Sequence, residues 1–289
     1  MNYINFVNHL LRCCVTAGSY AVAIQSRVRL QPEKKGGNPF TRALTDADLS
    51  VQNFFEVELL SAGYPIRFDP EEAAHSLNIG YFPSDANHMM LLDPIDGTKY
   101  YADGIPYFGI ACTLLRRDTI VAGVYCMPHQ GRAYVMVEGL SGPRSIHLLD
   151  SLKGLSLSLP TGGQPLRLRP ESTAIAVWDE HIDPAAMSRL RADGNTIACS
   201  TYPGPNPQQW RYGVPSVLAG DAAAIVKPRA KLLDFGMAAW IVEHAGGCVS
   251  DFAGNPIPNY LDYPDQRIPG LVCSRDRAVH ERIISALRG

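Results

Sequence analysis

The sequence lacks the marks of several protein classes. Its seven cysteines form an odd set without a Cys-x-x-Cys pair, which argues against a disulfide framework and against a cysteine zinc site. No apolar run approaches the ~20 residues of a membrane-spanning helix, and the first residues carry no basic segment of a secretory signal. We therefore expect a reducing, cytoplasmic compartment and no membrane partner.

The chain also has little net charge. Its 26 basic and 28 acidic residues give a formal charge of −2, so no bulk electrostatic field would recruit a nucleic acid polymer or an anionic membrane. Its eight histidines include no His-x-His or His-Glu-x-x-His pair, and no internal repeat or low-complexity tract is present. A small molecule is the expected partner.

What is present is the composition of a soluble globular protein. The 289 residues are 46% hydrophobic and 19% charged, and this length fits one large domain or two packed subdomains. A weakly patterned segment after residue 140 favours two. We predict an N-terminal α+β subdomain over residues 1–140 and a C-terminal α/β subdomain over residues 141–289.

Periodicity predicts the elements of both halves. Apolar residues at helical spacing predict helices at 4–24, from Leu49 to the breakers at Gly63 and Pro65, at 184–190, after Asp234, and at 279–287. Short apolar runs predict strands at 66–69, 110–115, 120–126, 134–137, 175–178, 248–251 and 271–273. Turn residues between the strands of the first half favour an antiparallel sheet. Breaker-rich loops are expected at 31–39 and 203–207.

One apolar run, at residues 91–98, ends in residues whose side chains and backbone could bind a ligand. Asp93 and Asp96 can face one cation, and Gly97 allows a ligand to approach the backbone closely. Oxygen-only ligands favour a hard ion such as Mg²⁺ over zinc. Taken alone, the run also fits a strand end with a solvated acidic turn, and that alternative stays open at this point.

Three further acids stand at the ends of predicted elements. Asp48 lies near a helix start, Glu71 follows a strand, and Asp234 opens a mostly buried helix. Acids at such positions are common on protein surfaces, so each by itself says little. Their combination with Asp93 and Asp96 indicates a metal site.

Four separated motifs, in order and spacing, resemble the inositol monophosphatase family. The first motif is Asp-Pro-x-Asp-Gly-Thr at 93–98. The second consists of Asp234, Ala-Gly-Gly at 245–247 and Asp251. The other two are Thr-x-x-Asp at 45–48 and the Glu pair at 71–72. The resemblance spans Asp48 to the C-terminus. It implies an α+β fold, the layered αβαβα sandwich of the inositol monophosphatase and fructose-1,6-bisphosphatase type. It also implies Mg²⁺-dependent, lithium-sensitive hydrolysis of a small phosphate monoester, and it leaves a homodimer open.

The resemblance assigns roles residue by residue. Glu71, Asp93 and the carbonyl of Ile95 would hold one Mg²⁺, and Asp93, Asp96 and Asp234 a second, in a site of two or three ions. Two such ions clamp the attacking and leaving oxygens of an in-line displacement. The catalytic residues would be Thr98, Asp48 and Glu71, with Thr98 oriented by Asp48 to position or deprotonate a metal-bound water. Amides at Gly97 and Thr98 would face the phosphate.

Departures from the family pattern fall on the substrate side. The family usually carries an Asn-Phe or Glu-Phe pair after Gly-Thr-x, and this chain has Lys99-Tyr100-Tyr101 there. Pro70 replaces a glycine before the Glu pair. Lys227 occupies the position of a sugar-binding Glu in inositol-specific members, and it is either a binding group for a second anion or a solvated surface charge. We expect Lys99 and Lys227 among the substrate-binding residues.

The substrate itself stays open. Alternatives to inositol monophosphate are a 3′(2′),5′-bisphosphate nucleotide, a sugar bisphosphate and histidinol phosphate, with specificity set by loops between Thr196 and Lys227. A metal-binding regulatory homologue with little turnover is the non-enzymatic alternative.

Two rival phosphatase motifs are weaker. Cys126 and Arg132 have the Cys-x5-Arg spacing of cysteine-dependent phosphatases, but Pro128 removes an amide from the required cradle, so a hairpin turn is favoured. Residues 46–50 are similar to the Asp-x-Asp-x-Thr motif of aspartate-nucleophile phosphatases. The segment before them is too short and too polar to form the buried strand that precedes this motif.

Overall fold

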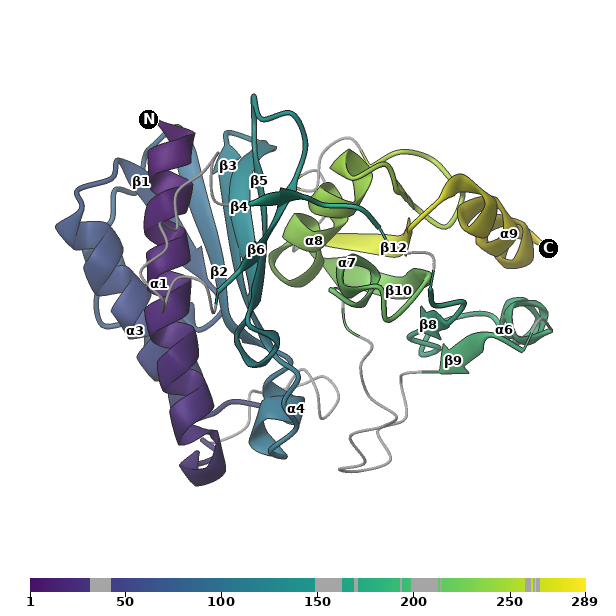
Figure 1. Cartoon of the computed structure of the whole chain (residues 1–289), viewed down its shortest axis with the longest axis horizontal. Helices are drawn as coiled ribbons and strands as arrows, with labels where there is room; N and C mark the ends of the chain where they lie inside the picture. Colours follow the sequence, from purple (N-terminus) through teal and green to yellow (C-terminus); the bar gives the residue numbers. More distant parts are fainter. Residues whose placement is uncertain are drawn as a thin grey trace. The chain divides into compact units, whose positions relative to one another are not determined.

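The computed structural model of the chain contains two compact units, Met1–Pro165 and Leu166–Gly289 (Figure 1). It describes residues 1–31, 43–148, 163–168, 171–192, 194–198, 213, 215–257, 261, 263 and 266–289. The division falls later than the position expected after residue 140, because strands β6 (Arg144–His147) and β7 (Gln164–Pro165) pair onto the first sheet. Backbone hydrogen bonds therefore keep this segment with the N-terminal unit.

The first unit is built on a seven-stranded sheet with the order β1-β2-β3-β4-β5-β6-β7. The other strands of this sheet are β1 (Ile66–Pro70), β2 (His88–Asp96), β3 (Gly109–Arg116), β4 (Thr119–Met127) and β5 (Arg132–Val137). The predicted antiparallel arrangement is confirmed from β2 to β7, whereas β1 runs parallel to β2. Parallel neighbours end at the same edge of a sheet, so β1 and β2 deliver their last residues together.

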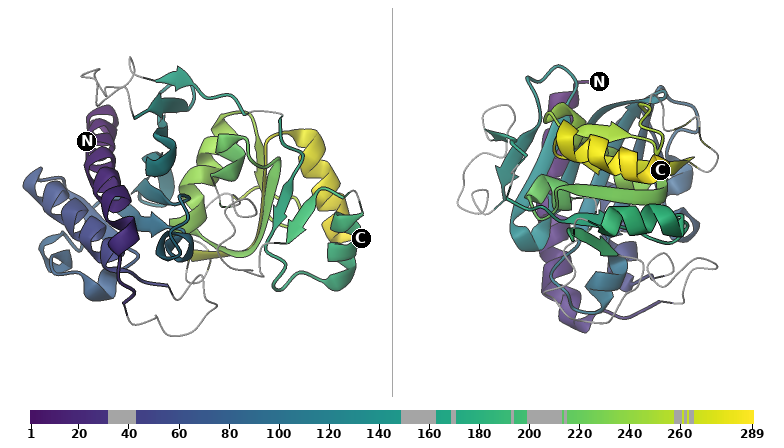
Figure 2. Two further views of the ribbon diagram at one scale, coloured as in Figure 1. Left: turned by 60° about the horizontal axis from the view of Figure 1, so that its bottom comes forward. Right: turned by 90° about the vertical axis from the view of Figure 1, so that its right-hand side faces the viewer.

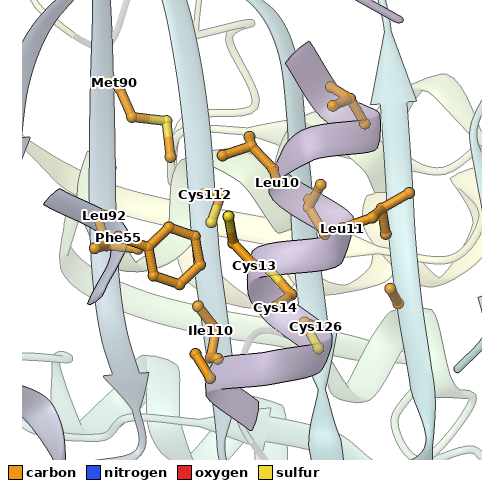
Figure 3. Close-up of a cluster of buried hydrophobic side chains, with 14 of the residues drawn as sticks. Leu10, Leu11, Cys13, Cys14, Phe55, Met90, Leu92, Ile110, Cys112 and Cys126 are labelled. Atoms are coloured by element: carbon orange, nitrogen blue, oxygen red, sulfur yellow. The ribbon is translucent and has the colours of Figure 1, made fainter. Parts of the chain in front are cut away.

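Helices α1 (Tyr3–Ile24) and α3 (Asp46–Ser61) pack on this sheet, α1 against β4 and α3 against β2. Figure 3 shows side chains of α1 and α3 interdigitating with alternate strand residues, among them Leu92, Cys112 and Cys126. Successive strand residues point to opposite faces. The residues next to these positions, including Asp93 and Tyr125, therefore face away from the two helices.

Short helical segments lie between the longer elements of the first unit. They are η1 (Gln25–Arg27), η2 (Ala73–His75), η3 (Ile79–Tyr81), α4 (Thr98–Ala102) and η4 (Pro128–Gln130). The first turn of α3 is fixed by a capping box, in which Thr45 is the N-cap and Asp48 the third residue of the helix. Asp48 therefore lies at a helix start, as the sequence predicts.

The second unit has a five-stranded mixed sheet with the order β11-β12-β10-β8-β9. Its strands are β8 (Ile175–Val177), β9 (Thr196–Ala198), β10 (Ala224–Lys231), β11 (Cys248–Ser250) and β12 (Arg267–Ser274). Helix α8 (Leu232–His244), with α7 (Ser216–Ala219) beside it, packs on one face, and α6 (Pro184–Arg191) with α9 (Arg277–Arg288) covers the other (Figure 2). The predicted helices and strands of this half are confirmed.

Two expectations fall outside the part of the chain that the structure describes. The loop expected at residues 31–39 is described only at Gln31, and the loop at 203–207 lies wholly outside. Residues 199–212 and 214, about half of the segment expected to set specificity, likewise lie outside the described residues. Among the described residues, no helix combines the length and the apolar character needed to cross a membrane.

The packing of α3 on the sheet gives a first testable prediction. Phe55 is fully buried in the core of the first unit, so Phe55→Ala should lower its free energy of unfolding by about 3–5 kcal/mol in urea titrations. Val57 lies two residues further along the same helix and is 52% exposed, so Val57→Ala should change stability by less than about 0.5 kcal/mol. Equal effects of the two changes would contradict this packing.

Candidate active site

The site begins where β2 loses its regular pairing. The register between β2 and β3 runs to Asp93, shifts, and resumes at Asp96 opposite Gly109. The amide of Ile95 donates to Asp93 Oδ1 at 3.1 Å inside this irregular stretch. Gly97 then adopts a left-handed conformation with φ of 91° before α4 begins, a conformation that disfavours side chains. The chain thus turns sharply behind two carboxylates.

Glu71 is placed beside Asp93 by the parallel pairing of β1 with β2. Pro70 is the register partner of Leu92, and the amide of Glu71 donates to the Leu92 carbonyl at 2.9 Å. Glu71 and Asp93 are therefore the next residues along two adjacent strands. Asp93 is only 3% exposed, and a buried carboxylate needs compensating charge or hydrogen bonds.

Thr98 is tied to α3 through the buried carboxylate of Asp48. Asp48 Oδ2 accepts from the Thr45 amide at 2.8 Å and from the Thr45 hydroxyl at 2.6 Å, which leaves Oδ1 to contact Thr98 Oγ1 at 3.1 Å. Thr98 Oγ1 also lies 2.9 Å from the Ile95 carbonyl oxygen. The Thr98 hydroxyl thus lies against the Asp48 carboxylate, and the catalytic role of this pair stays a prediction.

The Asp48–Thr98 pair can hold a proton at either oxygen. Burial raises the pKa of Asp48 to about 7, opposed by hydrogen bonds from Thr45 and supported by the negative charge of Glu71. A hydroxyl has one proton to donate, so Thr98 can donate to Asp48 or to the Ile95 carbonyl, but not to both. When Asp48 carries a proton it can donate to Thr98 Oγ1, which lets Thr98 donate to Ile95.

Asp96 has a partner that the sequence analysis missed. The hydroxyl of Tyr125, on β4, donates to Asp96 Oδ2. Burial, followed by the charge of Asp96, raises the pKa of Tyr125 well above its usual value, so the hydroxyl stays protonated. The approach requires Gly109, because a Cβ on that residue would collide with the Tyr125 hydroxyl and ring. Tyr125 lies on the sheet face that carries Asp93, but no periodicity singles it out.

Gln52 is a second missed residue, and it positions the Glu pair. Its side-chain oxygen accepts from the Glu72 amide at 3.0 Å, and its side-chain nitrogen donates to the Glu72 carbonyl at 3.2 Å. The same nitrogen donates to Glu56 Oε1 at 2.9 Å. Asp48, Gln52 and Glu56 follow one another at i, i+4 and i+8 and are all buried. Polar residues at helical spacing on an otherwise apolar helix face are a signal that the sequence does carry.

The two lysines expected at the substrate have different surroundings. Lys99 Nζ lies 2.8 Å from both carboxylate oxygens of Asp103, one helical turn along α4. Its charge is therefore paired locally. In the second unit, Lys227 Nζ lies 4.9 Å from the ring centroid of Trp178 and 5.6 Å from that of Phe235. Lys227 is thus a cation held against two aromatic rings rather than a fully solvated charge.

The predicted metal ligands fit a hard cation by their chemistry. The first unit supplies carboxylates from Glu71, Asp93 and Asp96 and the carbonyl of Ile95, all of them oxygen donors. Asp234 lies in the first turn of α8, in the second unit. Within the described residues, the three carboxylates of the first unit do not form a group in which all three offer oxygens within 4.8 Å of one another, and Asp96 is held by Tyr125. The ligand roles remain predictions.

Both rival phosphatase motifs are explained by the fold. Cys126 is fully buried on β4, which is joined to β5 by the short turn η4, as the hairpin interpretation predicts. A hydrogen bond with Cys14 and burial raise the pKa of Cys126 well above its usual value, so it is not a thiolate. Residues 46–50 form the start of helix α3, so they do not form a loop after a strand.

Comparison with known proteins agrees with this geometry. Residues 10–183 match the model of the inositol monophosphatase family. Since this match covers more than half of the chain, the protein belongs to that family of phosphatases.

Individual relatives are distant. A histidinol-phosphatase from Chlorobaculum parvum is 25% identical over 73% of each chain. An inositol-1-monophosphatase, ImpA, from Mycolicibacterium smegmatis is 28% identical over 77% of this chain and 74% of the relative. The crystal structure of an extragenic suppressor protein, suhB, from Bartonella henselae matches with a TM-score of 0.70 at 18% identity over 98% of both chains. The predicted α+β fold of this type is confirmed.

The close approach of Tyr125 to Gly109 gives a second prediction. Gly109→Ala should force Tyr125 away from Asp96 and lower the free energy of unfolding by about 1–3 kcal/mol, as overpacking of a core does. Chemical unfolding monitored by circular dichroism measures the change. Gly80→Ala is the matched control, because a Cβ there would meet nothing within 4 Å. A Gly109→Ala variant as stable as the control would show that this approach is not tightly constrained.

The buried carboxylate of Asp48 gives a third prediction, on pH dependence. Its pKa is raised from 3.8 to about 7 in the folded protein, so the native state binds more protons than the unfolded chain between these values. The free energy of unfolding should therefore fall as pH rises from about 4 to about 7, by on the order of a few kcal/mol.

Asp48→Asn removes this titration, so in chelator-treated protein its unfolding free energy should decline less than that of the wild type over the same window. Asp118→Asn, on an exposed turn, serves as the control. Wild-type and Asp48→Asn curves that run parallel from pH 4 to 7 would rule out the inferred titration.

Proposed function

We propose that this protein hydrolyses the phosphate monoester of a small metabolite in a Mg²⁺-dependent reaction. The observation that supports this most directly is the turn at residues 93–98, in which two carboxylates precede a left-handed glycine and a threonine held by Asp48. Family membership supports the same reaction class.

Each residue has a role within the proposal. Glu71, Asp93 and the Ile95 carbonyl would hold one ion, and Asp93 with Asp96 would hold another, to which the family pattern alone adds Asp234. When bound, such ions neutralise charge on the phosphoryl oxygens and lower the pKa of a nearby water. Tyr125 fixes the orientation of Asp96, and Gln52 fixes the loop that presents Glu71.

The Asp48–Thr98 pair orients the attacking water and accepts its proton. Thr98 Oγ1 lies within hydrogen-bonding distance of Asp48, and burial raises the pKa of Asp48 to about 7 in the metal-free protein. A group whose pKa lies near the working pH is suited to general base catalysis. The backbone amides at Gly97 and Thr98 are proposed to face the phosphate. In this scheme Glu71 acts through its ion.

The substrate is proposed to carry an anionic or polar group besides the phosphate ester. Lys227 is the basis, since its ammonium group is held against Trp178 and Phe235 at the position where inositol-specific members carry an acid. The pairing of Lys99 with Asp103 makes Lys99 the weaker candidate for direct substrate contact. Relatives named histidinol-phosphatase and inositol-1-monophosphatase make both of their substrates worth testing.

A phosphate-release assay tests the proposal, and its result is our fourth prediction. Purified protein with Mg²⁺ should release phosphate from at least one of inositol monophosphates, fructose 1,6-bisphosphate, adenosine 3′,5′-bisphosphate and histidinol phosphate. Asp93→Asn should reduce kcat by at least about a hundredfold, since it removes a carboxylate that would hold both ions. Asp118→Asn, the exposed-turn control, should retain wild-type rates.

Two outcomes would redirect the proposal. Wild-type turnover by Asp93→Asn would exclude a site centred on that residue. Calorimetric Mg²⁺ binding without hydrolysis of any tested ester would instead favour a regulatory homologue, an alternative raised by the resemblance to a protein named extragenic suppressor.

A further inference from the structure

A second group of metal-ligating side chains lies between α1 and α3. Among the described residues, His9, Cys13 and Glu58 are the one set of three in which every ligand atom lies within 4.8 Å of the others. His9 and Cys13 are four residues apart on α1, so their side chains share one face of the helix. Glu58 comes from α3, which packs against α1. Two helices thus converge with nitrogen, sulfur and oxygen donors.

The distance between two of these donors fits a shared cation. His9 Nε2 lies 3.3 Å from Glu58 Oε2, which is longer than the ~2.7–2.9 Å of a charge-assisted hydrogen bond. Tetrahedral bonds of about 2.0–2.2 Å from zinc to nitrogen and oxygen place those ligands about 3.4 Å apart. The spacing therefore suits two ligands of one ion at least as well as it suits a direct ion pair.

Tyr64 occupies the position of a supporting residue for such a ligand. Its hydroxyl lies 3.2 Å from His9 Nδ1, the other ring nitrogen. In protein metal sites the second nitrogen of a ligating histidine commonly bonds to a neighbouring polar group, which fixes the ring. Here the contact directs Nε2 toward Glu58 and Cys13.

The charge of the ligand set suits a divalent ion, although the buried thiol must lose its proton to bind one. Cys13 is 2% exposed and lies on the core side of α1 (Figure 3), and burial raises the pKa of its thiol to about 12. Metal ligation by cysteine requires the thiolate, so binding would release the thiol proton to solvent. One thiolate and one carboxylate would balance a charge of +2. The side chain of Glu58 is 42% exposed, which leaves an open path for entry.

We propose that His9, Cys13 and Glu58 form a zinc site, with a water as the fourth ligand. This site is separate from the Mg²⁺ site of the proposed function, and its donor set is different. Nitrogen and sulfur ligands favour zinc and its neighbours in the transition series, whereas the acids around Asp93 offer oxygen alone. A bound ion would join α1 to α3 and so stabilise the helical layer of the first unit.

Cobalt provides a direct test, because Co²⁺ substitutes for zinc and its absorption spectrum depends on the ligands that bind it. The full chain, freed of metal and supplied with excess Mg²⁺, is titrated with Co²⁺ and followed by absorption. We expect one equivalent to produce a near-ultraviolet thiolate-to-cobalt band together with the intense visible bands of tetrahedral cobalt, and Zn²⁺ to abolish both. Cobalt bound at oxygen ligands produces no thiolate band, so the two sites are distinguished.

Matched variants identify the ligands. Cys13→Ser should lose the thiolate band, while Cys248→Ser, which changes a partly exposed thiol in the other unit, should retain it. Tyr64→Phe should weaken Zn²⁺ binding by roughly 10–100-fold with the ring retained. Glu58→Gln, at a half-exposed position, tests the third ligand without disturbing the core and should also weaken binding.

The result does not depend on phosphatase activity. A protein that hydrolyses no ester can still show the cobalt band, and an active enzyme can lack it. Absence of a thiolate band in folded wild-type protein, or its persistence in Cys13→Ser, would overturn the zinc site. Unchanged Zn²⁺ affinity in both Tyr64→Phe and Glu58→Gln would do the same.

Discussion

The buried carboxylate of Asp48 is the constraint on which the proposed active site depends. One of its oxygens closes the capping box of α3 with Thr45, and the other contacts Thr98 in the turn after β2. A single side chain thus fixes both the start of a core helix and a residue of the proposed chemistry. Because the carboxylate is fully buried, it tolerates little displacement without losing hydrogen bonds that water cannot replace. Helix packing and site geometry are coupled for that reason.

Much of this arrangement could be predicted from the sequence. The apolar periodicity of α1 and of the strands fixed their faces, and the capping residues at Thr45 and Asp48 located the start of α3. The acids at the ends of β1 and β2 were found because strand ends and turn residues leave a local signal. The sequence did not predict that these acids lie side by side. The parallel pairing that sets Glu71 beside Asp93 joins segments separated by residues 72–87, and no local pattern encodes it.

Contacts that depend on tertiary packing escaped prediction. Tyr125 meets Asp96 across β3, through space left by Gly109, and a tyrosine in an apolar strand gives no sign of such a partner. The domain boundary was placed before β6 because that segment is weakly patterned, whereas strand pairing keeps it in the first unit. Lys227 was recognised by its position, but its contact with two aromatic rings required the fold.

The thiols beneath α1 have a consequence for how the core can be studied. Cys14, Cys112 and Cys126 are fully buried between α1 and the sheet (Figure 3). Burial raises the pKa of Cys112, and hydrogen bonds to neighbouring thiols together with burial raise the pKa values of Cys14 and Cys126. Alkylating reagents attack thiolates, which these groups do not form while covered. Their modification therefore requires α1 to separate from the sheet, and labelling rates under native conditions report the free energy of that opening. The protein carries its own probes of local unfolding at the centre of its first unit.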